Sequence, residues 1–357
     1  MKLTEILSIC INNNLPFYSY RLPESNNIVT GIQLTGHIQA FEGFETQTEG
    51  FVVVPFDINS NTESIILKAN ITFINADIDP HQLEKVCNTF LKNQLTETTS
   101  VEISKAVYLE QAKSLIEKLQ KQELEKVVLS RAQNNFTIDK NSATSIYEKL
   151  LHSYAHAFVS IFNIPNKATW VGATPETLLK MNHGMFETMS LASTKKSDSK
   201  AEWTIKENEE QQIVSDFVDE VIEPFPFNKI EKQGPSEMLA GNLVHLMTKF
   251  RCYGELSLDE RFKLLNMLHP TPAVCGIPKH DAMQMINATE AHDREYYAGY
   301  LGPISSEKLD LFVNIRCMKL NTQQATFFIG GGLTAQSKAE DEWTETCLKL
   351  ETLTKVF

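Results

Sequence analysis

The stretch Ala325-Thr326-Phe327-Phe328-Ile329-Gly330-Gly331-Gly332-Leu333 joins an apolar run to three consecutive glycines. Its apolar first half predicts a strand, and the three consecutive glycines then leave the backbone without side chains. Glycine permits a tight turn, and its N–H groups can approach an anion closely. We therefore expect a strand that leads into an anion-binding segment.

A helix is predicted directly after the glycines. Ser337-Lys338-Ala339-Glu340 has the pattern of a capping box, which predicts a helix from Ser337 to Phe357. Glu342, Glu345 and Lys349 share one face of this helix. An apolar stripe lies beside them, formed by Trp343, Cys347, Leu350, Leu353 and Phe357. Two carboxylates and an ammonium beside an anion site suggest a metal ion and a carboxylate substrate held together.

The composition limits the class of protein. The 357 residues allow either two domains or one large mixed domain, and a hydrophobic fraction of 42% is enough for a core. No run of 18 apolar residues is present to cross a membrane, and Met1 to Asn14 lacks the features of a secretory signal. The six cysteines are scattered without a CxxC pair, so we expect reduced thiols in a cytosolic protein, not disulfides or a zinc site.

The charge of the chain adds a further limit. A net charge of -12 argues against binding to nucleic acid or to an anionic membrane surface. An anionic substrate would therefore need local cations, and a metal ion would supply one.

The first hundred residues carry few chemical signals. We expect a helix at Leu3–Ile11, a strand at 50–54, a strand at 64–78 and a helix at 80–95. The polar stretch 93–100 is the best candidate for a flexible connection, although it is too short to be assigned as a domain linker.

Two segments of the middle region place single polar residues at notable positions. Residues 125–131 read as a strand that follows a helix, with Lys126, Val128 and Ser130 on one face. A lone lysine in such a strand is ordinarily a solvated edge position. In Gly172–Glu176, Thr174 is predicted to cap a short helical turn, where Glu176 would be a carboxylate favoured by the helix N-terminus.

The predicted amphipathic helix within 204–225 contains an anomaly. Its buried stripe, followed backwards from Phe217 through Val214, reaches Glu210 and then Glu207. Ionised carboxylates on a core-facing stripe are costly unless they are paired or bound to metal. Acidic residues are also favoured in the first turn of a helix, so this segment alone leaves both interpretations open.

Two further segments bear on a site. The prolines around Thr271 predict a rigid extended loop, in which His269 alone would more often be a structural histidine than a catalyst. Residues 309–320 and 325–330 are predicted to form a hairpin, with Arg316 on the same face as Asn314 and Phe312. An arginine in an apolar strand needs an anionic partner.

Taken together, these segments resemble the chorismate-utilising enzymes, the family of anthranilate, aminodeoxychorismate, isochorismate and salicylate synthases. The resemblance runs from about Glu123 to the end of the chain. It rests on ordered motifs: Lys-Val-Val-Leu-Ser-Arg at 126–131, Gly-Ala-Thr-Pro-Glu at 172–176, Leu-Ala-Ser-Thr at 191–194, His-Pro-Thr-Pro-Ala at 269–273, Asp-Arg-Glu-Tyr-Tyr-Ala-Gly at 293–299, Asn-Ile-Arg at 314–316, the glycine run and Glu-Trp-Thr-Glu-Thr at 342–346.

The resemblance implies a fold and a subfamily. The fold is α+β, with large antiparallel sheets packed face to face, helices outside and the active site in a central cleft. Residues 1–357 would form a single domain, in which 1–100 is the less recognisable part and 101–357 the catalytic core. Lys126 stands at the position of the water-activating lysine, and His269-Pro270-Thr271-Pro272 replaces a segment typical of ammonia-using members. Both features favour isochorismate synthase.

The resemblance also implies roles for individual residues. Lys126 would activate water, and Glu176 would protonate the departing C4 hydroxyl of chorismate, which requires a raised carboxyl pKa. The metal would be Mg²⁺, held directly by Glu210 and Glu345 and supported by Glu207 and Glu342. The remaining predicted substrate-binding residues are Arg316, Lys349, Tyr297, Gly330, Gly332, Thr194, His269 and Thr271.

Three positions depart from the family pattern. Ser193 replaces a usual glycine, Gln211 replaces a usual histidine, and Glu207 replaces a usual aspartate. These departures bear on turnover rate more than on identity, and they leave room for a relative that has lost activity.

The expected protein is a cytoplasmic monomer that acts without a glutaminase subunit. Its product would feed menaquinone or siderophore synthesis. The alternatives are a salicylate synthase, an ammonia-using synthase and a non-catalytic chorismate-binding relative.

Overall fold

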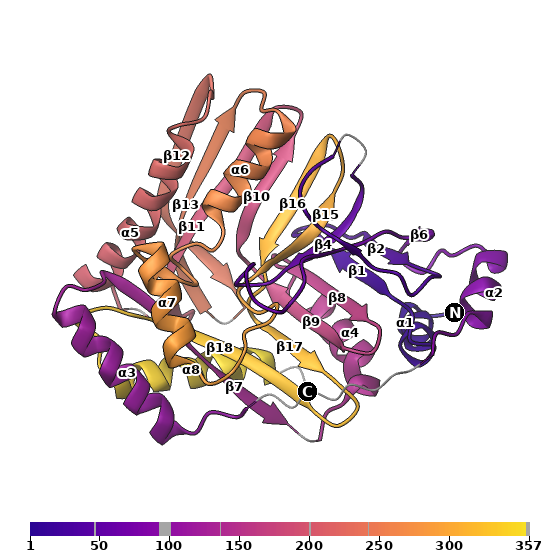
Figure 1. Ribbon diagram of the computed structural model, residues 1–357, viewed down its shortest axis with the longest axis horizontal. Helices are drawn as coiled ribbons and strands as arrows, with labels where there is room; N and C mark the ends of the chain where they lie inside the picture. Colours follow the sequence, from indigo (N-terminus) through magenta and orange to yellow (C-terminus); the bar gives the residue numbers. More distant parts are fainter. Residues whose placement is uncertain (46–47, 93–100, 136, 200, 242, 355–357) are drawn as a thin grey trace.

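The computed structural model describes residues 1–45, 48–92, 101–135, 137–199, 201–241 and 243–354. Within these residues the chain forms two antiparallel sheets of nine strands each (Figure 1). The first sheet has the spatial order β14 (Gly276–Ile277), β7 (Lys126–Asn135), β18 (Ala325–Leu333), β17 (Cys317–Leu320), β9 (Ala168–Thr174), β8 (Phe158–Ile164), β1 (Phe17–Arg21), β2 (Ile28–Ile32) and β6 (Ile71–Ile74). The second has the order β12 (Lys229–Ala240), β13 (Leu243–Tyr253), β11 (Met185–Lys196), β10 (Thr177–Asn182), β16 (Lys308–Val313), β15 (Tyr300–Ile304), β4 (Gly50–Val54), β5 (Ile65–Leu67) and β3 (Gln39–Ala40).

Helices pack on the outside of the two sheets. On the first sheet, α8 (Ala339–Thr354) contacts β18, α3 (Lys105–Gln120) and α7 (Lys279–Thr289) contact β7, and α4 (Ala143–Ser153) contacts β8 and β9. The short η1 (Lys140–Ser142) precedes α4, and α1 (Leu3–Asn12) packs on α4 and on α2 (Pro80–Asn88). On the second sheet, α5 (Ile205–Ile222) contacts β11 and α6 (Leu258–Leu268).

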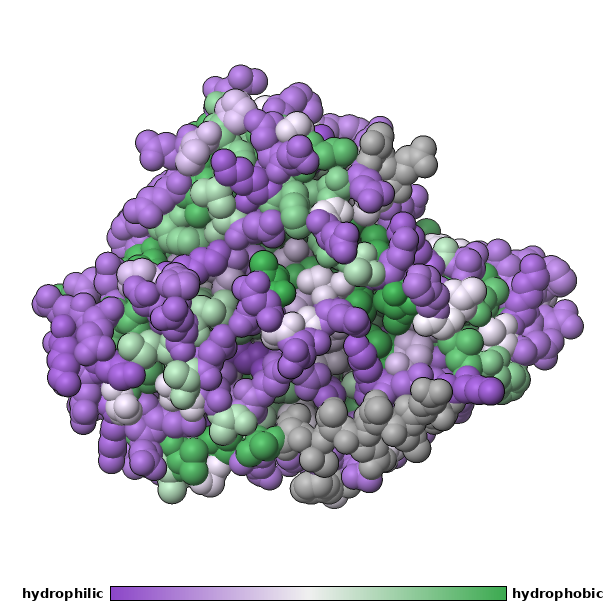
Figure 2. Space-filling view, viewed as in Figure 1, coloured by the Kyte–Doolittle hydropathy of each residue, from purple (hydrophilic) through white to green (hydrophobic). Residues whose placement is uncertain are grey.

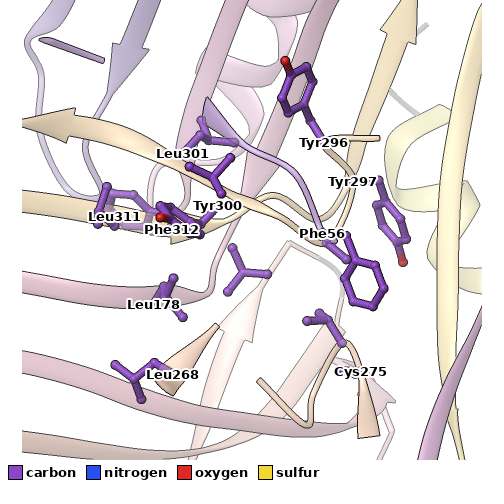
Figure 3. Close-up of a cluster of buried hydrophobic side chains, with 14 of the residues drawn as sticks. Phe56, Leu178, Leu268, Cys275, Tyr296, Tyr297, Tyr300, Leu301, Leu311 and Phe312 are labelled. Atoms are coloured by element: carbon purple, nitrogen blue, oxygen red, sulfur yellow. The ribbon is translucent and has the colours of Figure 1, made fainter. Parts of the chain in front are cut away.

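The largest core lies between the two sheets. Phe158 of β8 stacks on Phe312 of β16 with ring centroids 4.1 Å apart, and Tyr18 of β1 stacks on Phe51 of β4 at 4.9 Å. Figure 3 shows part of this cluster around Leu178, Leu301 and Leu311. These contacts confirm the predicted fold of antiparallel sheets packed face to face.

A second core lies between the first sheet and its outer helices. Strand β8 contributes to both cores, because Phe158 and Phe162 point to one side while Val159 and Ile161 point to the other. This double burial explains why apolar residues of β8 point to both faces of the sheet. On the face seen in Figure 2, hydrophilic residues cover most of the surface. In the described part of the chain, no helix combines the length and apolar character needed to cross a membrane.

The N-terminal third contributes strands to both sheets. Strands β1, β2 and β6 belong to the first sheet, and β3, β4 and β5 to the second. The single strand predicted at 64–78 is wrong, since β5 and β6 lie in different sheets. The predicted helix 80–95 ends at Asn88 as α2, and the predicted connection 93–100 lies outside the described residues. The division at residue 100 stays a prediction.

Two of the passages of the chain from one sheet to the other lie next to each other. Pro175 and Glu176 connect β9 to β10, and Asn314 to Arg316 connect β16 to β17. The strand predicted at 309–320 is therefore broken, and Arg316 has φ +51° at the break. The two crossings are hydrogen-bonded: the N–H of Val313 donates to the carbonyl of Glu176 at 3.0 Å, and the N–H of Ala173 donates to that of Arg316 at 3.1 Å.

The helical turn predicted after Thr174 is also absent from the described chain, because β10 begins at Thr177. The hydroxyl of Thr174 instead accepts the N–H of Glu176 at 3.2 Å, which fixes the crossing.

Candidate active site

A cavity lies where the chain crosses between the sheets. Strands β7, β11, β13 and β18, helices α5 and α8 and both crossings contribute to its wall. The structure brings together here most of the residues predicted from sequence: Lys126, Glu176, Thr194, Glu210, Tyr297, Arg316, Gly330, Gly332, Glu345 and Lys349.

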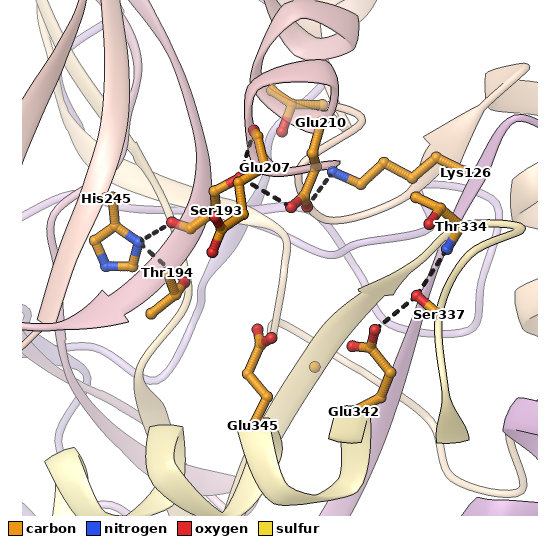
Figure 4. A network of polar contacts seen from close by, with 12 residues as sticks. Lys126, Ser193, Thr194, Glu207, Glu210, His245, Thr334, Ser337, Glu342 and Glu345 are labelled. Atoms are coloured by element: carbon orange, nitrogen blue, oxygen red, sulfur yellow. Dashed lines mark hydrogen bonds and ion pairs between the residues drawn. The ribbon is translucent and has the colours of Figure 1, made fainter. Parts of the chain in front are cut away.

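Lys126 is the first residue of β7, and its side chain is almost completely buried, with 1% of it exposed. Its Nζ lies 2.9 Å from Oε1 of Glu210 (Figure 4). Val128 lines the same cavity, as the alternation along the strand predicts. Arg131 points to the opposite face, where its guanidinium lies 4.3 Å from the centroid of Trp343. The lysine at this position is therefore an inward-facing group, not a solvated edge residue.

Glu176 lies at the first crossing and is 3% exposed. Burial raises the pKa of its carboxyl to about 7, although the hydroxyl of Thr271 and the charges of Lys126 and Arg316 act in the opposite direction. The hydroxyl of Thr271 donates to Oε1 of Glu176 at 3.4 Å. The raised pKa predicted from the resemblance is thus present, and such a carboxyl can donate a proton near neutral pH.

His269 is not among the residues that line the cavity, and the structure does not support its predicted substrate contact. Its Nε2 lies 3.0 Å from the carbonyl oxygen of Pro55, and its ring packs edge-on against Tyr300. Burial lowers the pKa of His269 to about 3, so the neutral imidazole donates from Nε2. The structural alternative for this histidine therefore holds. Thr271 acts on the site through Glu176.

The two glutamates of α5 that were predicted to lie near the metal have different contacts. The carboxylate of Glu210 accepts from Lys126 through Oε1 and from the Ser193 hydroxyl through Oε2 at 3.1 Å. Burial alone would raise the pKa of Glu210, but the Lys126 ammonium outweighs it and the pKa is lowered. Glu207 closes a capping box, in which its Oε2 accepts the N–H of Thr204 at 2.7 Å. Both interpretations of the anomalous stripe are therefore realised, one at each residue.

Gln211, which replaces a usual histidine, points away from the cavity. It is 2% exposed, and its Nε2 donates to the hydroxyls of Ser190 at 2.9 Å and Thr248 at 3.1 Å. It therefore ties α5 to β11 and β13, and its departure from the family pattern concerns the attachment of the helix.

Helix α8 presents Glu345 and Lys349 to the cavity. Their side chains form an ion pair at 2.7 Å, and Nζ of Lys349 also lies 3.1 Å from the carbonyl oxygen of Gly330. Glu342 is buried and is not among the lining residues; its Oε1 accepts the Ser337 hydroxyl at 2.6 Å.

The capping box predicted at Ser337 and Glu340 is wrong, because α8 begins at Ala339 and Ser337 binds Glu342 instead. Phe357 of the predicted apolar stripe lies outside the described residues, as does the side chain of Leu353.

The glycines permit close approach and do not form the predicted turn. Their backbone continues β18, with Gly330 opposite Ser130 and Gly332 opposite Val128 in the ladder. A Cβ atom on Gly330 would lie 2.7 Å from Oη of Tyr297. A Cβ atom on Gly332 would lie 2.9 Å from Cε of Lys126 and 3.0 Å from Oε1 of Glu210. A side chain at either position would therefore displace cavity residues from this strand.

His245 is a cavity residue that the sequence did not reveal. It lies on β13, with Nδ1 2.9 Å from the carbonyl oxygen of Ser193. Burial and the nearby Arg316 lower the pKa of His245 to about 3. The neutral ring donates from Nδ1, so Nε2 accepts from the guanidinium of Arg316. Arg316 also donates to the carbonyl of Ala240 at 3.1 Å. His245 thus helps to fix the orientation of the arginine.

The carboxylates of the cavity fit a hard cation bound by few protein ligands. Glu210 from α5 and Glu345 from α8 line the same space and point toward each other in Figure 4. In the part of the chain that the structure describes, no group of three or more His, Cys, Asp or Glu residues is close enough to hold a metal. Mg²⁺ typically uses one or two carboxylates and keeps several waters, so two such ligands are compatible with it.

Comparison with solved structures defines the class of fold. The chain superimposes on MenF, the menaquinone-specific isochorismate synthase from Escherichia coli, with a TM-score of 0.78 and 18% identity, over 96% of this chain and 88% of that one. It superimposes on DhbC from Bacillus anthracis with a TM-score of 0.79 and 22% identity, over 99% of both chains.

The sequence then defines the family. The model of the family described as "Chorismate binding enzyme" matches residues 35–357, and the chain belongs to this family. It is 28% identical over 246 residues to the isochorismate synthase EntC of Escherichia coli strain K12. This alignment covers 66% of the chain and 63% of the relative, a little under two thirds of that protein's length.

Proposed function

We propose that the chain is an isochorismate synthase, which converts chorismate into isochorismate in a reversible reaction. The observation that carries the proposal is the pairing of Lys126 and Glu176 in one cavity. One is a buried amine, and the other is a carboxyl whose pKa is raised by burial to about 7. Addition of water at one ring carbon and loss of a hydroxyl at another require such a base and such an acid.

The proposed reaction balances without an oxidant or reductant. Lys126 is paired with Glu210 as an ammonium in the substrate-free protein and would act as the base after losing that proton. Its amine then takes a proton from water, and the hydroxyl adds to C2 of the ring. The ring double bond shifts, and the C4 oxygen leaves as water after Glu176 donates its proton. One water enters and one leaves, so the proton gained by Lys126 must return to Glu176 before the next turnover. The reverse reaction uses the same two groups with their roles exchanged.

The cations of the cavity supply the proposed substrate contacts. Arg316 and Lys349 would bind a carboxylate of chorismate, with Tyr297 and the N–H groups near Gly330 and Gly332 beside them. Arginine suits this role because its guanidinium can bind a carboxylate through two parallel hydrogen bonds. Thr194 lines the cavity next to His245, which supports its assignment as a substrate contact.

We further propose that Glu210 and Glu345 would hold Mg²⁺. When bound, the ion would supply positive charge that polarises the ring carboxylate of the substrate. Each of the two carboxylates is paired with a lysine, Glu210 with Lys126 and Glu345 with Lys349. Each ion pair would therefore weaken when the carboxylate binds a cation. Glu207 and Glu342 remain predicted supporting carboxylates, although each accepts a hydrogen bond near the start of its own helix.

We also infer a cytoplasmic monomer that acts without a glutaminase subunit. The six free cysteines support a reducing compartment, and Lys126 at the water-activating position supports independence from ammonia. The isochorismate formed would enter either menaquinone or siderophore synthesis.

Product analysis tests the proposed function. Purified protein is given chorismate and Mg²⁺, with and without ammonium, and the products are separated by chromatography. We expect isochorismate alone, at a ratio to chorismate that is the same whether the reaction starts from either compound. Salicylate with pyruvate would assign the chain as a salicylate synthase, and an aminated product formed only with ammonium would assign an ammonia-using synthase. Chorismate binding without any product would indicate a non-catalytic relative.

A further inference from the structure

Ser193 occupies an irregular position in the cavity wall. The ladder between β11 and β13 shifts register between Ala192 and Lys195, which places Ser193 in a bulge. Its φ is +57°, in the left-handed region that glycine adopts readily and other residues seldom do. The side chain lines the cavity and is 7% exposed.

The hydroxyl of Ser193 contacts two acceptors on α5. It lies 2.8 Å from the carbonyl oxygen of Glu207 and 3.1 Å from Oε2 of Glu210 (Figure 4). The other carboxylate oxygen of Glu210 lies 2.9 Å from Nζ of Lys126. The two oxygens are therefore held from two strands that belong to different sheets, Oε1 from β7 and Oε2 from β11.

We propose that Ser193 is a positioning residue for Glu210, whose hydroxyl holds the carboxylate in the orientation that a divalent cation requires. The inference rests on the proposed function, which assigns Glu210 as a ligand of Mg²⁺. A glutamate side chain loses considerable conformational freedom when it is fixed, and a group that is already oriented loses less on binding. Hydrogen-bond partners of metal ligands commonly affect affinity in this way.

The carbonyl oxygen of Glu207 gives the Ser193 hydroxyl a second acceptor, so the hydroxyl can orient Glu210 without competing with a cation for its carboxylate. A hydroxyl has one proton to donate, and the carbonyl oxygen of Glu207 is the nearer of its two acceptors. When a cation engages Oε2 of Glu210, the proton can remain on the bond to Glu207. No buried donor is then left without an acceptor, and the carboxylate is released at little cost.

Two substitutions separate the hydroxyl from the backbone. Ser193→Gly removes the hydroxyl and suits the positive φ, whereas Ser193→Ala removes the hydroxyl and keeps the Cβ atom. Ser190→Ala is the matched control, because Ser190 lies on the same strand and its hydroxyl bonds Ser215 at 2.8 Å and Gln211 at 2.9 Å, not Glu210.

The experiment is titration of each substrate-free protein with Mg²⁺ or Mn²⁺ by calorimetry, together with thermal unfolding without metal. We expect about tenfold weaker cation affinity in both Ser193 variants. The unfolding temperature should be retained in Ser193→Gly. Ser190→Ala should unfold at a lower temperature and keep the affinity of the wild type.

Several outcomes would overturn the inference. Unchanged affinity in both Ser193 variants would show that the hydroxyl does not position Glu210. A loss confined to one variant would assign the effect to the backbone. A wild type that forms isochorismate but binds no divalent cation would overturn both the magnesium site and this inference. A wild type that binds the cation but forms no isochorismate would overturn the proposed function, and the affinities would still decide the role of Ser193.

Discussion

Two walls of one cavity carry the same chemical group in opposite electrostatic environments. At the crossing between the sheets, burial raises the pKa of Glu176 to about 7, and its hydrogen-bond partner is the neutral hydroxyl of Thr271 at 3.4 Å. At the start of α5, burial acts on Glu210 in the same direction, but the ammonium of Lys126 at 2.9 Å reverses it. Burial alone therefore does not decide the charge of a carboxyl.

The opposite pKa shifts of Glu176 and Glu210 suit the two carboxyls to different roles. A carboxyl that keeps its proton near neutral pH can donate it, and a carboxylate that stays ionised can hold a cation. The partner at hydrogen-bond distance makes the difference, a hydroxyl in one case and an ammonium in the other.

Lys126→Ala should have the largest effect. It removes the proposed base, so turnover should fall by about a thousandfold. Chorismate binding in the presence of Mg²⁺ should persist in calorimetry. Turnover is measured by chromatography of the products, and unchanged turnover would exclude Lys126 as the base. Lys105→Ala is the control, because Lys105 pairs with Glu340 at 2.9 Å on the exposed surface.

Glu176→Gln should lower turnover by about a hundredfold or more, because an amide cannot donate the required proton. In the wild type, the rate should fall as the pH rises through about 7, since only the protonated carboxyl acts as the acid. The variant should lose this dependence, which rate measurements on both sides of neutral pH would show.

Substitution of Thr271, the hydrogen-bond partner of Glu176, should also change the pH dependence. The hydroxyl of Thr271 lowers the pKa of Glu176, so Thr271→Val should move the alkaline fall of the rate to higher pH. A shift to lower pH, or none, would contradict the proposed control of Glu176 by Thr271.

Glu345→Gln should raise the Mg²⁺ concentration needed for half-maximal activity by about tenfold or more. Glu342→Gln should change it less, because Glu342 does not line the cavity and is bonded to Ser337. Activity measured over a range of Mg²⁺ concentrations compares the two variants. Equal effects would contradict the assignment of Glu345 as the direct ligand.

A further effect concerns the stability of the fold. The folded pKa of Glu176 lies above its ordinary value of 4.5, so the folded state binds this proton more tightly than the unfolded state does. The contribution is complete at pH values below about 4.5 and is lost as the pH rises to about 7. It is on the order of 3 kcal/mol. Urea unfolding of wild type and Glu176→Gln at several pH values should show the difference in stability changing in that interval, and a constant difference would contradict it.

The sequence predicted the family, the class of fold and most of the cavity residues, because ordered motifs carry that information. Periodicity also predicted which face of β7 holds Lys126. It failed where the chain changes sheets: residues 309–320 read as one strand, and only the structure shows the break that brings Arg316 to Glu176. His245 gave no signal, because a single histidine within an apolar strand resembles any structural histidine.

Local hydrogen bonds account for the remaining differences. Ser337 and Thr174 carry the side chains of helix caps, yet each bonds a residue of the site region, Glu342 in one case and Glu176 in the other. Glu207 shows the reverse, since a residue expected beside the metal closes a capping box. A short-range sequence pattern shows that a side chain can cap a helix. The tertiary contacts decide which group that side chain actually bonds.

The position of β18 has a consequence for how cells make this protein. It is the last strand along the described chain, yet it lies between β7 and β17 inside the first sheet. Until the ribosome has released residues 325–333, β7 and β17 have no strand between them, and each exposes an unpaired edge that favours aggregation. A premature stop before Ala325 would also omit Gly330, Glu345 and Lys349. A chain that stops before β18 would therefore lack part of the proposed site, and chaperones would meet an open sheet until that strand has been made.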